Sequence, residues 1–144
     1  MSRFKDKFAI ISGGASGMGA ATAKRFVEEG GSVITLDLNE ELGMNVAEEI
    51  GDSCEFFKAD VSKAEDWNKL EDHLGSRFKE ITSVVNAAGI SEPATIEDET
   101  IDHWDRVHAI NGTSVFLGCQ FAVKAMKDGC LLYTSPSPRD RYGS

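Results

Sequence analysis

Short apolar runs alternate with amphipathic segments along most of the chain. The runs that read as buried strands are residues 8–11, 32–37, 54–58 and 81–85. Between them, apolar residues recur every three or four positions, which is typical of helices that pack one face on a core. Strands and helices that alternate in this way form a parallel sheet covered on both faces. The pattern therefore predicts an α/β fold with a doubly wound parallel sheet, its first four strands in the order 3-2-1-4.

The same spacing predicts which helical positions face the core. The first helix is expected at residues 20–29. The apolar rows expected of the later helices are Leu42, Val46 and Ile50, then Trp67, Leu70, Leu74 and Phe78, then Trp104, His108, Asn111, Val115, Gly118, Ala122 and Ala125. Asn39 and Thr100 suit helix N-caps, and residues 62–65 fit a capping box. Asn111 is thus expected at a core position, where its amide needs hydrogen-bond partners.

The segment between the first strand and the first helix contains three glycines with the spacing Gly13-x-x-x-Gly17-x-Gly19. A strand, a tight turn and a helix N-terminus together bring bare N–H groups and the positive end of the helix dipole to one spot, which suits a pyrophosphate. We expect Gly13 to allow the turn, Gly17 to let the phosphate approach, and Gly19 to let the helix lie close on the strand. For the glycines alone, a plain strand–helix corner is the alternative.

Polar residues follow the other strands at their carboxyl ends. Asp37 ends the second strand, Asp60 follows the third, and Asn86 follows the fourth. Ligands of open α/β sheets bind beyond the carboxyl ends of the strands. These residues and the glycine turn are therefore expected to share one ligand. The alternatives are an ordinary turn residue for Asp37, a helix-entry residue for Asp60, and a packing corner at Asn86.

Composition narrows the class of protein. A length of 144 residues with 41% hydrophobic residues suits one domain with a real core. A net charge of −9 and a pI near 4.8 argue against nucleic acid or an anionic membrane as partner. No apolar run reaches the length of a membrane span. The three cysteines have no metal-ligand spacing, so we expect no metal site and a reducing, cytoplasmic compartment.

The character of the chain changes near residue 130. Two prolines and two serines fall where another buried strand is expected, and the segment is similar to a translated sequencing adapter. We therefore divide the chain into a domain at residues 1–129 and a non-native tail at 130–144. Leu131 to Tyr133 can add a short stretch of pairing, but the far edge of the fourth strand is expected to stay mostly open.

The motifs together resemble the short-chain dehydrogenase/reductase family, in its simple single-domain branch. They are the glycine turn beginning at Ser12, Asp37, the run Asn86-Ala87-Ala88-Gly89, and Asn111. The likeness covers residues 4–129, close to the N-terminal, cofactor-binding half of a typical member. It implies a Rossmann-like sheet truncated after the fourth strand and the helix that follows it. Ser12 and Met18 stand where the family more often has threonine and isoleucine, which should not disturb the turn.

The resemblance implies that the ligand is a nicotinamide dinucleotide. The residues that match the family's cofactor-binding positions are Ser12, Gly13, Ser16, Gly17, Met18, Gly19, Asp37, Leu38, Asp60, Val61, Asn86, Ala87, Ala88 and Gly89. Asp37 comes 18 residues after Gly19, as expected of a carboxylate that binds both adenosine ribose hydroxyls. A 2′-phosphate there would be repelled by about 4 kcal/mol at ~4 Å and a dielectric of ~20, an upper-end figure. No Lys or Arg stands between Gly13 and Gly19 or directly after Asp37, so NAD is favoured over NADP.

The family's catalytic residues are only partly present. Asn111 resembles the residue that holds a water in the family's proton relay, and a purely structural asparagine is the alternative. The Tyr-x-x-x-Lys pair has no match in the sequence, and His73, His103 and His108 are interpreted as histidines on helix faces. The chain is thus interpreted as the inactive N-terminal fragment of an NAD-dependent oxidoreductase for a secondary alcohol or ketone, whose parent is expected to be a homo-oligomer. A non-catalytic dinucleotide-binding module is the alternative.

Overall fold

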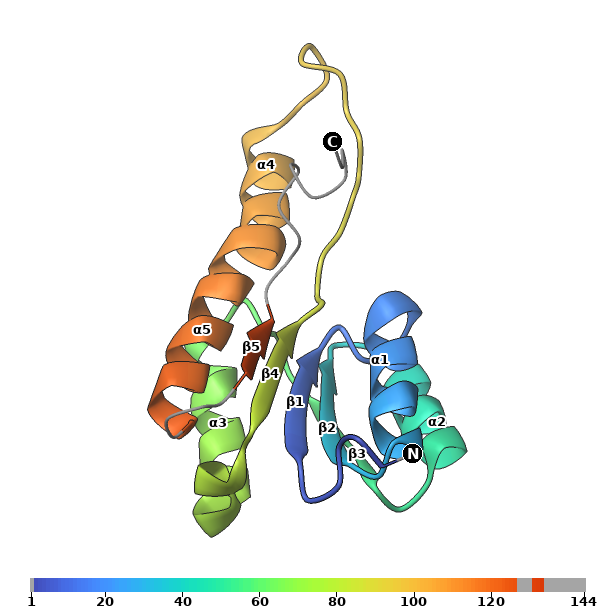
Figure 1. The fold of residues 1–144 in the computed structure, drawn as a ribbon. Coiled ribbons are helices and arrows are strands. Elements are labelled where there is room, and N and C mark those ends of the chain that lie inside the picture. Colours follow the sequence, from blue (N-terminus) through green and yellow to red (C-terminus); the bar gives the residue numbers. More distant parts are fainter. Residues whose placement is uncertain (1, 127–130, 134–144) are drawn as a thin grey trace, which may run out of the picture.

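The computed structural model describes residues 2–126 and 131–133. Within them the strands form one parallel sheet in the order β3-β2-β1-β4-β5 (Figure 1). The strands are β1 (Phe8–Ser12), β2 (Ser32–Asp37), β3 (Cys54–Lys58), β4 (Ser83–Asn86) and β5 (Leu131–Tyr133). The predicted order of the first four strands is confirmed, and so are the bounds of β2 and β3. The fourth strand begins at Ser83 instead of residue 81, and it includes Asn86.

Helices cover both faces of the sheet (Figure 1). The α-helices are α1 (Gly17–Glu28), α2 (Glu40–Ile50), α3 (Ala64–Leu74), α4 (Ile101–His108) and α5 (Ser114–Ala125). A 3₁₀ segment, η1 (Gly75–Glu80), follows α3, and a π-helical segment, η2 (Ala109–Thr113), joins α4 to α5. Helices α1 and α2 pack on one face of the sheet, and α3 and α5 pack on the other. The doubly wound α/β class is therefore confirmed.

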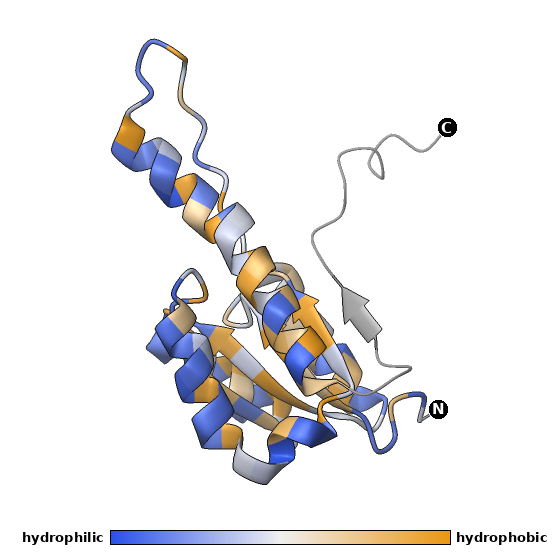
Figure 2. Cartoon of the chain, turned by 90° about the vertical axis from the view of Figure 1, so that its left-hand side faces the viewer, coloured by the Kyte–Doolittle hydropathy of each residue, from blue (hydrophilic) through white to orange (hydrophobic). Residues whose placement is uncertain are grey.

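Successive residues of β1 supply the cores on the two faces. Phe8 and Ile10 belong to the cluster that contains α3 and α5, whereas Ala9 and Ile11 belong to the cluster that contains α1. Neighbouring side chains of a strand point to opposite faces, so a central strand with helices on both sides must be apolar throughout. Ile10 and Ile11 are both fully buried, which is worth about 1.5–3 kcal/mol for each side chain. Figure 2 shows the strands as the apolar centre between helices with polar outer faces.

The three predicted helix-capping features are confirmed in two cases. The Asn39 side chain accepts from the N–H of Leu42 at 3.0 Å, and Thr100 accepts from the N–H of His103 at 3.2 Å. The capping box at residues 62–65 is wrong, because Lys63 is the N-cap of α3 and makes no side-chain cap. The Ser62 hydroxyl instead donates to a carboxylate oxygen of Asp60, at 2.6 Å.

Two expectations for the first helices also change. Helix α1 begins at Gly17, three residues before the predicted start, so the second and third glycines of the turn form its first turn. In α2, Leu42 is 47% exposed, and Gly43 is the residue that faces the sheet. A Cβ added to Gly43 would lie 2.0 Å from the Phe56 ring. The face of α2 that contains Gly43 is therefore the one that packs on the sheet, because only a glycine leaves room there for this ring. The second of the three predicted rows is confirmed: Trp67, Leu70, Leu74 and Phe78 are all buried.

The row predicted along the last helix is correct only in its second half. Gly118, Ala122 and Ala125 are buried, whereas Trp104 and Asn111 are exposed. Helix α4 extends beyond the sheet (Figure 1), and no strand of the described residues covers it there. The π-helical segment η2 also shifts the phase of α4 relative to α5, because it carries more residues in each turn than an α-helix. A row at uniform helical spacing therefore cannot continue through it.

The short stretch of pairing expected from Leu131 to Tyr133 is confirmed, because these residues form β5, which pairs with β4 in parallel. The far edge of β4 is less open than expected. Ser83, Val84 and Val85 face residues 131, 132 and 133, so three of the four residues of β4 are paired. Residues 127–130 and 134–144, which include most of the predicted tail, lie outside the described residues. None of the described helices combines the length and the apolarity that a membrane span requires.

Candidate functional site

The carboxyl edge of the sheet carries an open groove of about 390 Å³. Its walls come from the turn after β1 and from the segments that follow β2, β3 and β4. The predicted residues that line it are Gly13, Ser16, Gly17, Met18, Gly19, Asp37, Leu38, Asp60, Val61, Ala87, Ala88 and Gly89. The structure thus brings together, at one edge, residues that span more than half of the chain. This geometry follows from the parallel order of the strands.

The groove also contains residues that the sequence reasoning missed. They are Leu36, Ala59, Ile90 and Ile110. Leu36, Ala59 and Ile90 each adjoin a predicted residue in the sequence, so extending each motif by one position would have found them. Ile110 comes from η2 and also adjoins a predicted residue, Asn111, but only the three-dimensional fold shows that this segment reaches the groove.

Two predicted residues, Ser12 and Asn86, lie beneath the groove instead of lining it. The buried Ser12 hydroxyl accepts from the N–H of Ala88 at 3.2 Å and donates to the carbonyl of Val85 at 3.5 Å. Asn86 is 4% exposed and packs so tightly against α5 that a Cβ added to Gly118 would lie 2.0 Å from its Oδ1. Both side chains therefore brace the floor of the groove.

The glycine turn is shaped by one close approach and one open space. A Cβ on Gly19 would lie 2.0 Å from the carbonyl oxygen of Gly13, so only glycine lets α1 lie this close to the turn. Gly17 has a φ of +53°, in the left-handed region, and a Cβ there would have no neighbour within 4 Å. The backbone at Gly17 thus faces open space at the start of α1. The N-cap residue Ser16 makes no side-chain cap there.

Asp37 connects the glycine turn to the start of α2. Its Oδ2 accepts from the N–H of Ala15 at 3.1 Å, and its Oδ1 accepts from the N–H of Asn39 at 3.1 Å. A carboxylate has about four lone-pair sites, so these two bonds leave acceptor capacity on both oxygens. Leu38 and Met18, which also line the groove, are 56% and 74% exposed.

Asp60 has the structural role that was its alternative interpretation, and it also lines the groove. Its Oδ1 accepts from both the N–H and the hydroxyl of Ser62, at 3.0 and 2.6 Å. Its own N–H donates to Asp66 at 2.8 Å. Hydrogen bonds from Lys69 and from this N–H lower the pKa of Asp66. These bonds fix the entry into α3 while Asp60 stays at the groove wall.

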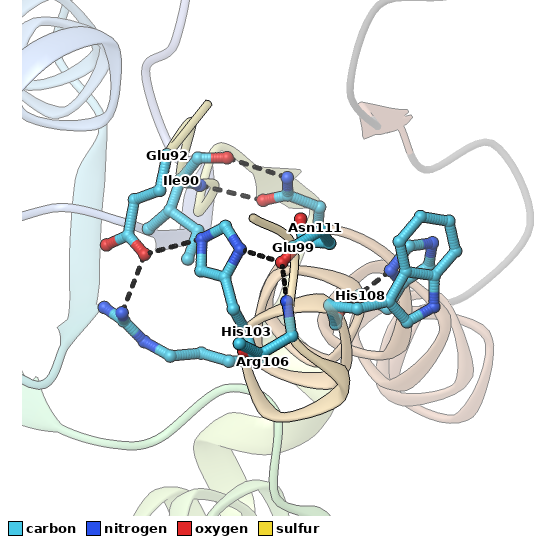
Figure 3. Close-up of polar contacts among 9 residues, drawn as sticks. Ile90, Glu92, Glu99, His103, Arg106, His108 and Asn111 are labelled. Atoms are coloured by element: carbon cyan, nitrogen blue, oxygen red, sulfur yellow. Dashed lines mark hydrogen bonds and ion pairs between the residues drawn. The ribbon is translucent and has the colours of Figure 1, made fainter. Parts of the chain in front are cut away.

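Asn111 occupies an exposed position in η2, contrary to the expected core position, yet both its amide oxygen and its amide nitrogen are hydrogen-bonded (Figure 3). Its Oδ1 accepts from the N–H of Ile90, and its Nδ2 donates to the carbonyl of the same residue, both at 2.8 Å. A pair of bonds to one residue fixes both position and orientation. Asn111 thus holds the segment that follows β4 against the long helix, without lining the groove itself.

Two of the three histidines make further polar contacts close to this segment. His103 lies between Glu92 and Glu99, and His108 stacks on Trp104 with ring centroids 4.1 Å apart (Figure 3). The hydrogen bond from His103 lowers the pKa of Glu99. Within the described part of the chain, no group of three or more His, Cys, Asp or Glu side chains is arranged to hold a metal ion.

These features define what the groove can bind. It offers the N-terminus of α1, an acceptor carboxylate at Asp37, and apolar walls from residues such as Val61 and Ile90. No Lys or Arg occurs among the described residues that line it. A ligand that carries phosphates, hydroxyls and flat apolar rings matches these groups.

Comparisons with known proteins agree with this geometry. The family model described as short chain dehydrogenase matches residues 7–130. The 2,5-dichloro-2,5-cyclohexadiene-1,4-diol dehydrogenase LinX of Sphingobium indicum is 43% identical over 124 residues, which are 84% of this chain and 50% of that protein. A 3-alpha-(or 20-beta)-hydroxysteroid dehydrogenase of Mycobacterium tuberculosis is 38% identical over 88% of this chain and 48% of its own.

Two further comparisons concern the cofactor and the fold. An NADP-dependent (R)-specific alcohol dehydrogenase of Lentilactobacillus kefiri is 37% identical over 88% of this chain and 51% of its own. A crystal structure titled short-chain dehydrogenase/reductase SDR:Glucose/ribitol dehydrogenase, from Brucella melitensis, superposes with a TM-score of 0.87 and 28% identity over 98% of this chain and 61% of that one. The chain spans about half the length of the curated relatives it matches.

Proposed function

Because the chain belongs to the short-chain dehydrogenase family, whose members are oxidoreductases that use NAD(P), we propose that its groove binds NAD in preference to NADP. We further propose that the whole protein is an NAD-dependent oxidoreductase that moves hydride between a secondary alcohol or ketone and nicotinamide. The observation that carries the cofactor proposal is the position of Asp37, which lines the same groove as the glycine turn.

The shape of the turn supports a dinucleotide. A pyrophosphate needs bare N–H groups and room to approach them, and Gly17 faces open space at the start of α1. Ser16, Gly17 and Met18 are the residues proposed to hold the phosphates through their backbone. Asp60 and Val61 are proposed to contact the adenine, and Ala87, Ala88 and Gly89 to lie along the rest of the cofactor.

The preference for NAD is an electrostatic argument. Asp37 is proposed to accept hydrogen bonds from the adenosine ribose hydroxyls, with the acceptor capacity that its bonds to Ala15 and Asn39 leave. A 2′-phosphate at that place would face the carboxylate, and no described Lys or Arg lining the groove would neutralise it. The relative from Lentilactobacillus kefiri, whose name states NADP dependence, shows that this family includes members that use NADP, so the cofactor preference must be tested for this chain.

For the chemistry of the whole protein, bound nicotinamide supplies the hydride acceptor or donor. Asn111 is the only residue of this chain to which we assign a part in proton transfer, through a water that it would hold beside the groove. Its two bonds to Ile90 set its orientation for this role. The substrate is proposed to be a small alcohol or ketone, and the whole protein a homo-oligomer.

A titration with both reduced cofactors tests the preference. NADH and NADPH are added to the 144-residue chain, and binding is followed by the fluorescence of the reduced nicotinamide. We expect NADH to bind more tightly by about ten-fold or more, since 1.4 kcal/mol corresponds to a factor of ten. Equal affinities, or tighter binding of NADPH, would overturn the assignment of Asp37.

A matched pair of variants separates the local effect from net charge. Asp37→Ser removes the carboxylate at the groove, and we expect it to reduce the preference for NADH. Asp52→Ser removes the same charge from an exposed position that does not line the groove, and we expect it to keep the wild-type preference. If both variants changed the preference equally, the effect would be one of net charge, and the proposal would fail.

A further inference from the structure

The loop between β4 and α4, residues 87–100, is attached to the long helix at two successive places. Asn111 binds Ile90 through two hydrogen bonds. Two residues further along the loop, Glu92 belongs to a polar cluster formed by Glu92, Glu99, His103 and Arg106 (Figure 3). The first four residues of the same loop, 87–90, line the groove. The polar cluster is therefore in a position to control how firmly this rim of the groove is held.

His103 is the centre of the polar cluster. Its Nδ1 lies 2.5 Å from an oxygen of Glu99, and its Nε2 lies 3.3 Å from an oxygen of Glu92. Arg106 reaches the same oxygen of Glu92 at 2.8 Å, from the next turn of α4. Glu92 and Glu99 from the loop and Arg106 from the helix are the charged groups that the described residues bring to this ring. The imidazole is only 23% exposed, so it lies inside the cluster.

The His103 ring faces two carboxylates, and a neutral imidazole has too few N–H donors to bind both. A neutral imidazole has one N–H donor and one bare nitrogen, whereas an ionised carboxylate only accepts. Facing two carboxylates, the neutral ring can donate to one of them and must turn a lone pair toward the other. The protonated ring donates to both. Protonation also changes the net charge of the four groups from minus one to zero, which removes an unbalanced charge from a partly buried site.

We propose that His103 is a protonation-dependent positioning residue, which in its charged form ties Glu92 and Glu99 to α4 and so holds the groove rim at residues 87–90 in place. The Glu99 carboxylate stays ionised through the range in which histidine titrates, because its pKa is lowered from an ordinary value of 4.5. The inference concerns the loop of this chain and does not depend on which ligand the groove binds.

The proposal predicts how the loop responds to pH. Histidine is the side chain that ordinarily changes charge between about pH 5 and pH 8. With the ring charged, both carboxylates are attached and the loop is held, whereas with the ring neutral one of the two attachments weakens. Ion pairs at partly exposed sites contribute modestly, so we expect a change of roughly three-fold in the opening equilibrium of the loop.

Amide hydrogen–deuterium exchange of the 144-residue chain, corrected for intrinsic exchange rates, measures this opening. In the wild type we expect the peptide covering residues 87–99 to be roughly three-fold more protected at about pH 5.5 than at about pH 8. His103→Gln, which cannot gain a proton, should show equal protection at both values. Protection of the wild-type loop that does not change with pH, or a pH dependence that persists in His103→Gln, would overturn the proposal.

The matched control is His108→Gln, in the same helix. Its Nδ1 contacts the backbone carbonyl of Trp104 at 2.9 Å and takes no part in the polar cluster. This variant should keep the wild-type pH response of the loop. If His108→Gln also abolished the response, His103 would not be its source, and the proposal would fail.

A second measurement needs no substitution of His103. In an NMR titration of the wild-type chain, the ring protons of His103 and the backbone amide of Glu92 should change with the same midpoint. An amide of Glu92 that is insensitive to the titration of His103 would overturn the proposal. Amide hydrogen exchange at β1 and β2, measured in the same samples, verifies that the sheet stays folded throughout the titration.

Discussion

Asp37 and Ala15, which are 22 residues apart, are joined by a hydrogen bond of 3.1 Å from the N–H of Ala15 to the Asp37 carboxylate. The carboxylate that we propose for ribose binding therefore also holds the glycine turn. Its second oxygen receives the N–H of Asn39 at the start of α2. A change at Asp37 is thus expected to alter the shape of the groove as well as its charge.

The first prediction concerns this structural role. In Asp37→Ala, the amide of Ala15 should exchange faster, and the free energy of unfolding should fall by about 1–2 kcal/mol, because a hydrogen bond to a charged acceptor is lost at a partly buried site. Asp52→Ala, at an exposed position, is the control and should leave both unchanged. Unaltered exchange at Ala15 in Asp37→Ala would show that the bond does not hold the turn.

The second prediction concerns the contact between α5 and β4. A Cβ at residue 118 would lie 2.0 Å from Oδ1 of Asn86, which is buried beneath the groove. Gly118→Ala should therefore lower the free energy of unfolding by about 1–3 kcal/mol, the usual cost of overpacking. Urea denaturation at constant pH measures the difference.

Gly112→Ala is the matched control for that prediction. An added Cβ there meets no atom within 4 Å, so the substitution should be neutral or stabilise by up to about 1 kcal/mol through helix propensity. If both variants had the same stability as the wild type, the contact between Gly118 and Asn86 would be looser than the structure shows.

The third prediction concerns pH and Glu29, at the C-terminal end of α1. Hydrogen bonds from Arg3 and from Arg25, together with the charges of both, lower the pKa of Glu29 to about 2, although its burial opposes this. The N-terminal segment is held at the same place, because the Phe4 and Phe26 rings stack with centroids 4.2 Å apart.

The sign of the effect follows from linkage. A carboxyl group whose pKa is lower in the folded than in the unfolded chain stabilises the fold above its unfolded pKa of about 4.5. This stabilisation is lost progressively as the pH falls toward about 2. We therefore expect the wild type to lose more stability between pH 7 and pH 3 than Glu29→Gln does, measured by urea denaturation at both values.

The control for this prediction is the neighbouring residue. Glu28 is exposed, so Glu28→Gln should lose as much stability in acid as the wild type. A loss in Glu29→Gln that equals the wild-type loss would show that the ion pairs with Arg3 and Arg25 contribute nothing to acid sensitivity.

The fourth prediction concerns turnover. No tyrosine among the 144 residues is followed four positions later by a lysine, so the pair that moves the proton in this family is not part of this sequence. General acid–base help is worth about 10²–10⁴-fold. We expect the chain to bind the dinucleotide and, with NAD⁺ supplied as the oxidant, to oxidise no secondary alcohol. NADH formation that rises in proportion to the chain concentration would contradict this.

Much of the fold could be predicted because the strands are buried on both faces. Short runs rich in β-branched and apolar residues, such as 32–37, favour a strand, and β2 has the predicted bounds. The N-cap at Asn39 was also predictable, because its partner Leu42 is local in the sequence. The predicted capping box does not form because the Ser62 hydroxyl donates to Asp60 instead, which is a competing local hydrogen bond.

The candidate site was predictable for a similar reason and within similar limits. Parallel strands bring their carboxyl ends to one edge, so Asp37 and the glycine turn could be placed together from the sequence. His103 could not be assigned a role, because its partner Glu92 stands eleven positions earlier, in a loop without periodicity. The bond between Asp37 and Ala15 was equally hidden, because no sequence pattern marks a backbone N–H as a partner.

Because of the π-helical segment η2, the side chains of α4 and those of α5 are out of phase around the long helix. Each residue in an α-helix turns the chain by about 100°, so the number of residues between α5 and α4 decides which way His103 points. Deleting one residue within 109–113 would leave α5 packed on the sheet and would rotate all of α4 about the helix axis by part of a turn. Asn111 and His103 would then swing away from the loop together. The number of residues in η2 thus sets the orientation of α4, whose side chains hold the loop at the groove rim.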